Sequence, residues 1–370
     1  MVKSKYGYID TPALLIDYDQ MMKNLHWMQA KADKYQVKLR PHTKTHKMPA
    51  LAKLQVELGA SGITVAKVGE AEVMAQNGIT DIFIANEIVG VSKLERIREL
   101  NRQIRIRIGV DNEYQINQLA EVFRDEEKAI EVLIELEVGE NRSGVITDEQ
   151  LLSLARYIEQ TPKVELKGIF SHEGQTYKAK DSADCIALAR ESQERTVRAA
   201  NKIRSLGIDI DTVSIGATPS LMQADIMAGI TEIRPGTYIF MDAGQGNALG
   251  DFSTCAATIL TTIISKPTAE RVVLDAGAKS LTSQNRSGGI CASPGFGLVK
   301  NSKEIRLSGL YDEHGLIYDR EFSESIQIGD KIEVIPNHIC PACNLYDSAY
   351  LVSQGEIKGE LPILCRGKLR

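Results

Sequence analysis

The sequence contains no apolar run approaching the ~18 residues that a membrane-spanning helix requires, and its start, Met1 to Lys5, is largely polar. We therefore expect neither a membrane anchor nor a secretory leader. Cysteine is sparse, with six residues scattered through 370, a usage typical of thiols in a reducing cytoplasm. An excess of basic residues is also missing, since the formal net charge is -5. These absences predict a cytoplasmic protein without a nucleic-acid or membrane partner.

Hydrophobic residues make up 43% of the chain, and a length of 370 residues suggests two domains or a barrel with an appendage. From Val37 to Asp242, short β-branched runs alternate with amphipathic helical patterns, which is typical of parallel strands joined by crossover helices. Helical patterns cover Ser92–Leu100, Asp148–Tyr157 and Ala183–Ser205. The eight expected strands predict a closed (β/α)8 TIM barrel; they are Val37–Arg40, Gly62–Ala66, Asp81–Ala85, Ile104–Val110, Glu131–Glu137, Leu166–Ser171, Thr212–Ile215 and Glu232–Phe240.

The composition changes after Asp242, where a glycine-rich segment leads into strand patterns without helices. Turn residues separate these patterns, so we expect a C-terminal all-β domain over residues 245–370. Its expected strands are Cys255–Ser265, Arg271–Asp275, Lys331–Pro336, Ala349–Val352 and Leu361–Cys365. An early strand pattern, Ala13–Asp17, could join either domain.

The most informative motif is Arg40-Pro-His-Thr-Lys-Thr-His-Lys47, which follows the first expected barrel strand. Like charges disfavour the ammonium form of a lysine, so crowding by other cations makes Lys44 easier to deprotonate. A neutral amine is the form that attacks an aldehyde to give a Schiff base. The alternative is a solvated basic turn without chemistry.

Polar and glycine residues also follow later strands, at the rim where barrels carry their active sites. They lie in Gly139–Gly144, Ser171–Tyr177, Gly216–Ser220 and Arg234–Tyr238. Gly216–Ser220 runs into a helical pattern, so its backbone N–H groups and the hydroxyls of Thr218 and Ser220 could bind an anion. Ser220 could instead only cap the helix. A phosphate site in the same barrel as a reactive lysine suggests a phosphorylated aldehyde cofactor.

A second cluster, Pro336-Asn-His-Ile-Cys-Pro-Ala-Cys-Asn344, follows an expected strand. His338 and Cys340 are two residues apart, so on an extended backbone they would point the same way. Imidazole with thiolate suits zinc, and two protein ligands leave positions open for water and substrate. We expect Cys343 to be a buried small residue rather than a ligand, although the CxxC spacing also permits a redox pair. His314, in Tyr311–Gly315, is expected in a surface turn.

Together these segments resemble the D-threonine aldolase and D-serine dehydratase family of pyridoxal 5'-phosphate (PLP) enzymes, which have an alanine-racemase-like fold of type III. The resemblance covers nearly the whole chain. It rests on Thr11–Asp17, Arg40–Lys47, Thr64–Glu72, Gly216–Ser220, Arg234–Tyr238 and Pro336–Cys340. It implies a PLP barrel over residues 20–244 and a β domain, carrying the metal site, formed by residues 1–19 and 245–370. It also implies a homodimer whose active sites are shared between subunits.

The same resemblance implies a role for individual residues. Lys44 would form the Schiff base with PLP, Tyr177 would approach the pyridine nitrogen, and Arg142 would lie near the phenolic oxygen. His338 and Cys340 would hold a divalent metal beside the cofactor, with zinc favoured over manganese or magnesium. The expected phosphate ligands are Thr218, Gly236, Thr237 and Tyr238.

The implied function is a PLP- and metal-dependent lyase that acts on a small D-3-hydroxy amino acid. The favoured reaction is retro-aldol cleavage of the D-threonine aldolase type, giving glycine and an aldehyde. Dehydration of D-serine or 3-hydroxy-D-aspartate to a 2-oxo acid and ammonia is the alternative, and it is favoured by the His-x-Cys pair. A PLP-dependent amino-acid racemase on the same fold, which should not need the metal, is a further alternative.

Overall fold

The computed structural model describes residues 3–302 and 304–370. Contacts divide the chain into two compact units. The barrel unit comprises Met28–Lys44, Pro49–Gly236 and Gly367–Arg370, and the sheet unit comprises Met1–Trp27, Thr45–Met48 and Thr237–Arg366. The chain passes from the sheet unit into the barrel unit within helix α1, Tyr18–Lys34.

The barrel unit is built on one sheet of eight parallel strands in the order β2-β9-β8-β7-β6-β5-β4-β3. A bridge between His42 and Thr64 joins its two ends, and the Thr64 amide donates to the Pro41 carbonyl at 2.8 Å. The predicted eight-stranded barrel is therefore confirmed. The strands are β2 (Lys38–Leu39), β3 (Ile63–Val65), β4 (Asp81–Glu87), β5 (Arg105–Val110), β6 (Ile130–Leu136), β7 (Val164–Ser171), β8 (Thr212–Ile215) and β9 (Glu232–Ile233).

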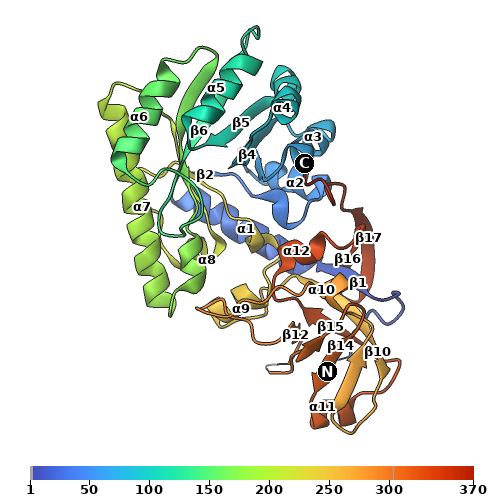
Figure 1. Ribbon diagram of the computed structural model, residues 1–370. Coiled ribbons are helices and arrows are strands. Elements are labelled where there is room, and N and C mark those ends of the chain that lie inside the picture. The colour runs from blue at the N-terminus through green and yellow to red at the C-terminus, as the bar shows by residue number, and fades with distance from the viewer. Residues whose placement is uncertain (1–2, 303) are drawn as a thin grey trace. The chain divides into compact units, whose positions relative to one another are not determined.

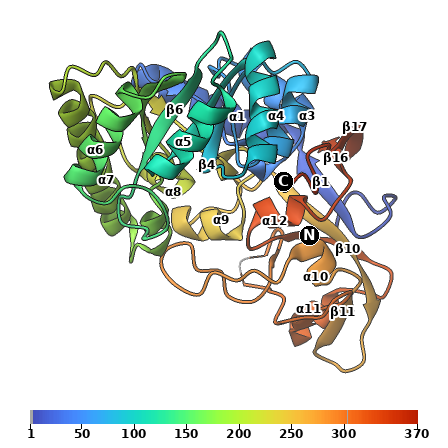
Figure 2. The same cartoon turned by 45° about the horizontal axis from the view of Figure 1, so that its top comes forward.

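Helices follow the strands and cover the outside of this sheet, where α3 to α7 lie side by side (Figures 1 and 2). Their apolar stripes explain this arrangement: in α4, the buried residues Leu94, Ile97 and Leu100 recur at helical spacing. The helices are α2 (Pro49–Glu57), α3 (Val68–Gln76), α4 (Val91–Gln103), α5 (Glu113–Val122), α6 (Asp148–Glu159), α7 (Ser182–Ser205) and α8 (Thr218–Gln223).

The barrel interior combines an aromatic core with buried charges. Phe83 and Phe170 meet edge to face at 5.0 Å, and the Arg234 guanidinium lies 5.1 Å from the Phe170 ring. Arg40, which is 2% exposed, forms ion pairs with Glu232 at 2.6 Å and with Asp81 at 2.7 Å. These ion pairs neutralise the guanidinium of Arg40, the first residue of the basic motif Arg40–Lys47.

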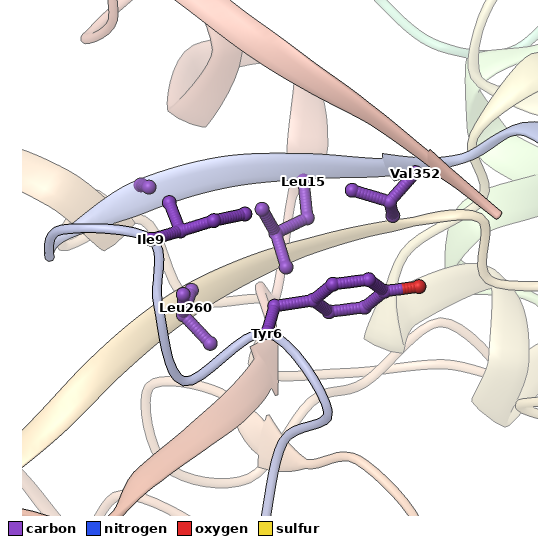
Figure 3. Close-up of a cluster of buried hydrophobic side chains, with 6 residues drawn as sticks. Tyr6, Ile9, Leu15, Leu260 and Val352 are labelled. Atoms are coloured by element: carbon purple, nitrogen blue, oxygen red, sulfur yellow. The ribbon is translucent and has the colours of Figure 1, made fainter. Parts of the chain in front are cut away.

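The sheet unit contains β1 (Ala13–Asp17), which is antiparallel to β10 (Ala257–Ser265) and parallel to β16 (Ser348–Ser353). The early strand therefore joins the C-terminal sheet, and Figure 3 shows the apolar cluster of Tyr6, Ile9, Leu15, Leu260 and Val352 beside it. The other strands are β11 (Arg271–Leu274), β12 (Leu298–Val299), β13 (Gly309–Leu310), β14 (Gly315–Tyr318), β15 (Lys331–Ile335) and β17 (Glu356–Pro362).

The predicted C-terminal β domain is confirmed, but the expectation that it lacks helices is wrong. Four short helices interrupt it: α9 (Ala243–Leu249), α10 (Ala278–Leu281), α11 (Arg320–Ser325) and α12 (Ile339–Cys343). Asp242 caps α9 by accepting the Gln245 amide, and Asp319 caps α11 by accepting the Phe322 amide. Such caps permit helices that are too short to show an apolar period.

Two expected strands also differ in extent. The strand expected over Glu232–Phe240 ends at Ile233, because Pro235 has no N–H to continue a ladder and Thr237–Ile239 turns into a 3-10 helix. The strand expected over Leu361–Cys365 is instead β17, which ends at Pro362. Beyond it, the Cys365 amide donates to the carbonyl of Lys47 rather than to a neighbouring strand.

Candidate functional site

Lys44 lies in a 3-10 turn, Thr43–Thr45, directly after β2 at the C-terminal rim of the barrel strands. Its backbone N–H points to Nδ1 of His42 at 3.4 Å, so this nitrogen acts as an acceptor. Burial lowers the pKa of His42 well below its usual value, and the charges of Lys44 and Arg234 lower it further. His42 is therefore neutral near pH 7 and carries its proton on Nε2.

A histidine and a carboxylate meet at the same rim. His172 follows β7, and its Nδ1 lies 2.9 Å from Oε2 of Glu140 in the loop after β6. Burial lowers the pKa of His172 despite the opposing effect of Glu140, and the charge of Lys44 lowers it further. Burial alone would raise the pKa of Glu140, but His172, Arg142 and Lys44 outweigh it and lower that pKa. Neutral His172 thus donates from Nδ1 and keeps a lone pair on Nε2.

Arg142 is half-exposed and is held by two carboxylates. Its guanidinium lies 3.4 Å from Oε1 of Glu135, which is on β6, and 3.3 Å from Oε2 of Glu140. Because Glu140 also contacts His172, one carboxylate links the arginine to the histidine. A cation fixed in this way can face an anionic oxygen without turning toward solvent.

The loop after β8 contains a buried hydroxyl that finds no hydrogen-bond partner among residues 3–302 and 304–370. This is Oγ1 of Thr218, the first residue of α8, and Thr218 is only 1% exposed. Two residues later, Ser220 donates to Oε2 of Glu173, whose other oxygen is also buried and without a partner in the described structure. Burial raises the pKa of Glu173 to about 7, although Ser220 and Arg234 act in the opposite direction.

The remaining site residues predicted in the barrel unit are Tyr177 and Gly236. Tyr177 is half-buried in the 3-10 turn Gly174–Lys178, which follows Glu173. Gly236 comes two residues after Arg234, whose guanidinium donates to Ser214 Oγ at 2.6 Å and to the Ser171 carbonyl at 2.7 Å.

The predicted metal ligands lie at the start of α12 in the sheet unit. His338 Nδ1 is 2.9 Å from the amide oxygen of Gln284, so Nδ1 carries the proton and Nε2 keeps its lone pair. The Cys340 sulfur lies 3.3 Å from Thr45 Oγ1 and 3.7 Å from Thr237 Oγ1, so two hydroxyl groups surround it. Thr237, predicted to bind phosphate, therefore contacts the predicted metal ligand within this unit.

The local backbone at these ligands differs from the expectation. His338 is extended, with φ -143° and ψ 110°, but it is the N-cap of α12, and Cys340 lies in the first helical turn. The prediction that both side chains project from one extended backbone is therefore wrong. Cys343 is fully buried, Tyr238 is 1% exposed, and His314 lies in an exposed turn.

Sequence reasoning quoted the motifs that contain His42, His172, Glu173 and Arg234 but assigned these side chains no role. The rim segment Gly139–Gly144 likewise contains Glu140, to which no role was assigned. Their common signal is position, since each lies at or just after the carboxyl end of a barrel strand. A systematic survey of charged residues at these positions would have found them.

Comparison with known proteins gives these features a family. The family model for the alanine racemase N-terminal domain matches residues 16–244. A second model, described for serine dehydratases, matches residues 256–352. The D-threonine aldolase of Arthrobacter sp. is 33% identical to this chain over 363 residues, which cover 97% of this chain and 93% of that enzyme. The chain belongs to the D-threonine aldolase and D-serine dehydratase family.

Solved structures agree over the full length. The D-threonine aldolase of Filomicrobium marinum matches with a TM-score of 0.90 and 30% identity, covering 100% of this chain and 99% of that one. D-threo-3-hydroxyaspartate dehydratase from Delftia sp. HT23 also has a TM-score of 0.90, with 28% identity, and covers 98% of this chain and 99% of that one. A cysteine-to-alanine variant of a dehydratase with that name was solved in the metal-free form.

These matches confirm the predicted membership of the D-threonine aldolase and D-serine dehydratase family and its alanine-racemase-like fold. The relatives are named aldolases and dehydratases, so the interpretation of this chain as a lyase of that family is confirmed as well. Among the described residues, every helix is too short or too polar to span a bilayer.

Proposed function

We propose that this protein is a PLP- and divalent-metal-dependent lyase that cleaves a D-3-hydroxy amino acid, such as D-threonine, to glycine and an aldehyde. The observation that carries the proposal is the arrangement around Lys44. The positive charge of Lys44 lowers the pKa values of His42, His172 and Glu140, which supports a primary amine near two histidines and a carboxylate. The 33% identity to a D-threonine aldolase over 97% of the chain supports the aldol reaction.

The residues of the barrel unit fit PLP. The buried Thr218 hydroxyl lacks a partner in the described structure, and a phosphate oxygen would supply one. Lys44 would hold the aldehyde carbon, Arg142 would face the phenolic oxygen, and Tyr177 would approach the pyridine nitrogen. PLP, when bound, supplies an electron sink for the pair released at the substrate's α-carbon. The phosphate ligands proposed in this unit are Thr218 and Gly236, and the family resemblance adds Thr237 and Tyr238, which follow Gly236 in the chain.

The residues at α12 fit a divalent metal. His338 presents Nε2 because Gln284 occupies Nδ1, and the two hydroxyls near Cys340 can donate to a thiolate. No cluster of three histidine, cysteine or acidic ligands is found in the part of the chain that the structure describes. Two protein ligands leave positions for water and the substrate 3-hydroxyl, whose acidity a Lewis acid increases. Imidazole with thiolate favours zinc, with manganese or magnesium as alternatives.

The side chains at the rim of the barrel would donate and accept protons during the reaction. His172 can accept a proton at Nε2, because its Nδ1–H is directed to Glu140 and the resulting imidazolium would face a carboxylate. His42 can donate from Nε2, because its Nδ1 is the acceptor for the Lys44 amide. Arg142, held by Glu135 and Glu140, provides a fixed positive charge.

Dehydration is the second candidate, because His338 and Cys340 form a His-x-Cys pair and a D-threo-3-hydroxyaspartate dehydratase is 30% identical over 90% of the chain. The test is to supply D-threonine, D-serine and 3-hydroxy-D-aspartate and to assay the products. Glycine with acetaldehyde from D-threonine supports the aldolase. A 2-oxo acid with ammonia and no glycine would show that the enzyme is a dehydratase instead.

Three further measurements address the cofactors. Lys44→Ala should abolish the yellow absorbance of lysine-bound PLP together with lyase turnover. Chelation should stop lyase turnover while that absorbance persists. Turnover that survives chelation, with only the enantiomer as product, would identify a racemase instead.

We also propose that the enzyme is a cytoplasmic homodimer with shared active sites. All six cysteines are thiols, which suits a reducing compartment, and the family resemblance supports the dimer. Light scattering should give twice the chain mass of 40.8 kDa. A measured mass equal to that of one chain, at the concentration used in the activity assay, would show that the enzyme is not a dimer.

A further inference from the structure

Two cysteines lie on the same turn of α12. Cys340 and Cys343 are three residues apart in Ile339–Cys343. The rise and radius of an α-helix separate such Cα atoms by about 5 Å. That distance lies within the roughly 4.4–6.8 Å found across disulfides. The backbone therefore already holds the two residues at a spacing that a disulfide can bridge.

The two thiols differ in access. Cys340 is half-buried and lies in the first turn of the helix, with the hydroxyls of Thr45 and Thr237 beside its sulfur. Cys343 is 0% exposed at the end of the helix. An oxidant from solvent therefore reaches Cys340 first, and Cys343 is positioned to react with the oxidised sulfur. This is the arrangement of an attacked and a resolving cysteine.

The pair is also distinct from the remaining cysteines of the chain. Cys185, Cys255, Cys291 and Cys365 lie outside α12.

We propose that Cys340 and Cys343 form a reversible disulfide when hydrogen peroxide oxidises the protein, and that this bond removes Cys340 from the metal. The Cys340 sulfur attacks a peroxide oxygen, the O–O bond breaks, and a sulfenic acid and one water form. The Cys343 sulfur then attacks the sulfenic sulfur, the S–OH bond breaks, and a second water leaves. Two thiols are oxidised, and one peroxide is reduced to two waters.

The loss of the metal rests on the proposed function, in which Cys340 is a ligand. A thiolate binds a divalent metal, but a sulfur in a disulfide carries no charge and binds weakly. His338 alone cannot retain the ion, so oxidation would inactivate the enzyme until a dithiol restores both thiols. The bond would also protect Cys340 from irreversible oxidation to a sulfinic acid.

The test treats zinc-loaded protein with one equivalent of hydrogen peroxide. Mass spectrometry should find the loss of two hydrogen atoms on the peptide that contains Cys340 and Cys343. A chromophoric chelator should detect one zinc released per disulfide, and dithiothreitol should reverse both changes. Treated with two equivalents, Cys343→Ala should instead accumulate sulfinic acid on Cys340 that dithiothreitol does not remove, because the two steps from thiol to sulfinic acid each consume one peroxide. Cys185→Ala, a buried cysteine of α7, is the matched control and should behave as the unmodified protein.

Two outcomes are distinguishable. Sulfinic acid on Cys340 of the unmodified protein, without a 340–343 disulfide, would overturn the inference whether or not zinc is bound. A disulfide that forms reversibly in protein that binds no zinc would support the modification site and would refute the proposed metal site.

Discussion

Replacing Thr218 by valine tests the proposed phosphate site without disturbing the fold. The valine has nearly the same shape, and the hydroxyl it removes is buried and makes no hydrogen bond within the described residues. Such a group carries a desolvation penalty of about 1–3 kcal/mol, so its removal should leave the stability of the cofactor-free protein unchanged or raise it. A hydrogen bond to a charged phosphate contributes about 1.5–3 kcal/mol. Its loss should weaken PLP binding about 10- to 150-fold.

Thr196→Val is the matched control, because Thr196 is equally buried but its hydroxyl donates to the Ser192 carbonyl at 2.8 Å and lies 3.1 Å from Ser171 Oγ. This variant should lose about 1–3 kcal/mol of unfolding free energy and keep its affinity for PLP. Calorimetric titration of cofactor-free protein with PLP, together with urea unfolding, measures both quantities. If Thr218→Val lowers stability and leaves PLP affinity unchanged, the hydroxyl serves the fold and the phosphate assignment is wrong.

Two further substitutions probe the charges of the barrel. Glu140→Gln removes a group that raises the pKa of His172, so the acid limb of the pH profile of kcat/KM should move to lower pH. We also expect kcat to fall about 10- to 100-fold. An acid limb at the same pH as in the unmodified enzyme would exclude His172 as the base. Arg40→Met should cost about 3–5 kcal/mol at neutral pH by urea unfolding, because the buried carboxylate of Glu232 loses its ion-pair partner and the half-buried Asp81 loses one of its arginines. Burial would raise the pKa of Glu232 and Asp81, but Arg40, together with Arg107, outweighs it and lowers both. The stabilisation is therefore lost as pH falls through these lowered pKa values, and the two proteins should converge in acid; a constant difference would contradict the pairing.

The barrel could be predicted because its signals are local and repeated. The strands are short runs rich in β-branched residues, as in β5 and β6, and amphipathic helices such as α4 separate them. The weakest strands, β2 and β9, have two residues each, and their extent depends on pairing rather than on propensity. The strand expected over Glu232–Phe240 was too long because the apolar run continues past Pro235, where the ladder cannot.

The sheet unit was harder to predict because short helices replace part of the expected β structure. In α12 a proline occupies the third position, and an apolar pattern of five residues cannot distinguish a helix from a strand. The spacing of His338 and Cys340 identified a candidate ligand pair, but the extended geometry assumed for it was wrong. Helical spacing also places Cys343 on the same face of α12 as Cys340, because residues three positions apart are neighbours on a helix surface.

The electrostatic surroundings of Lys44 differ from those that the sequence predicts. The sequence suggested that neighbouring cations alone would disfavour its ammonium form. Within the barrel unit, however, Arg40 is satisfied by Glu232 and Asp81, and His42 is neutral because burial lowers its pKa. The surroundings of the amine are therefore less cationic than the motif implies. What the fold supplies instead is a set of neutral imidazoles with defined tautomers, His42 donating and His172 accepting at Nε2. In the proposed mechanism, proton transfer at this rim would depend on the contact between Glu140 and His172 more than on the number of positive charges in the motif.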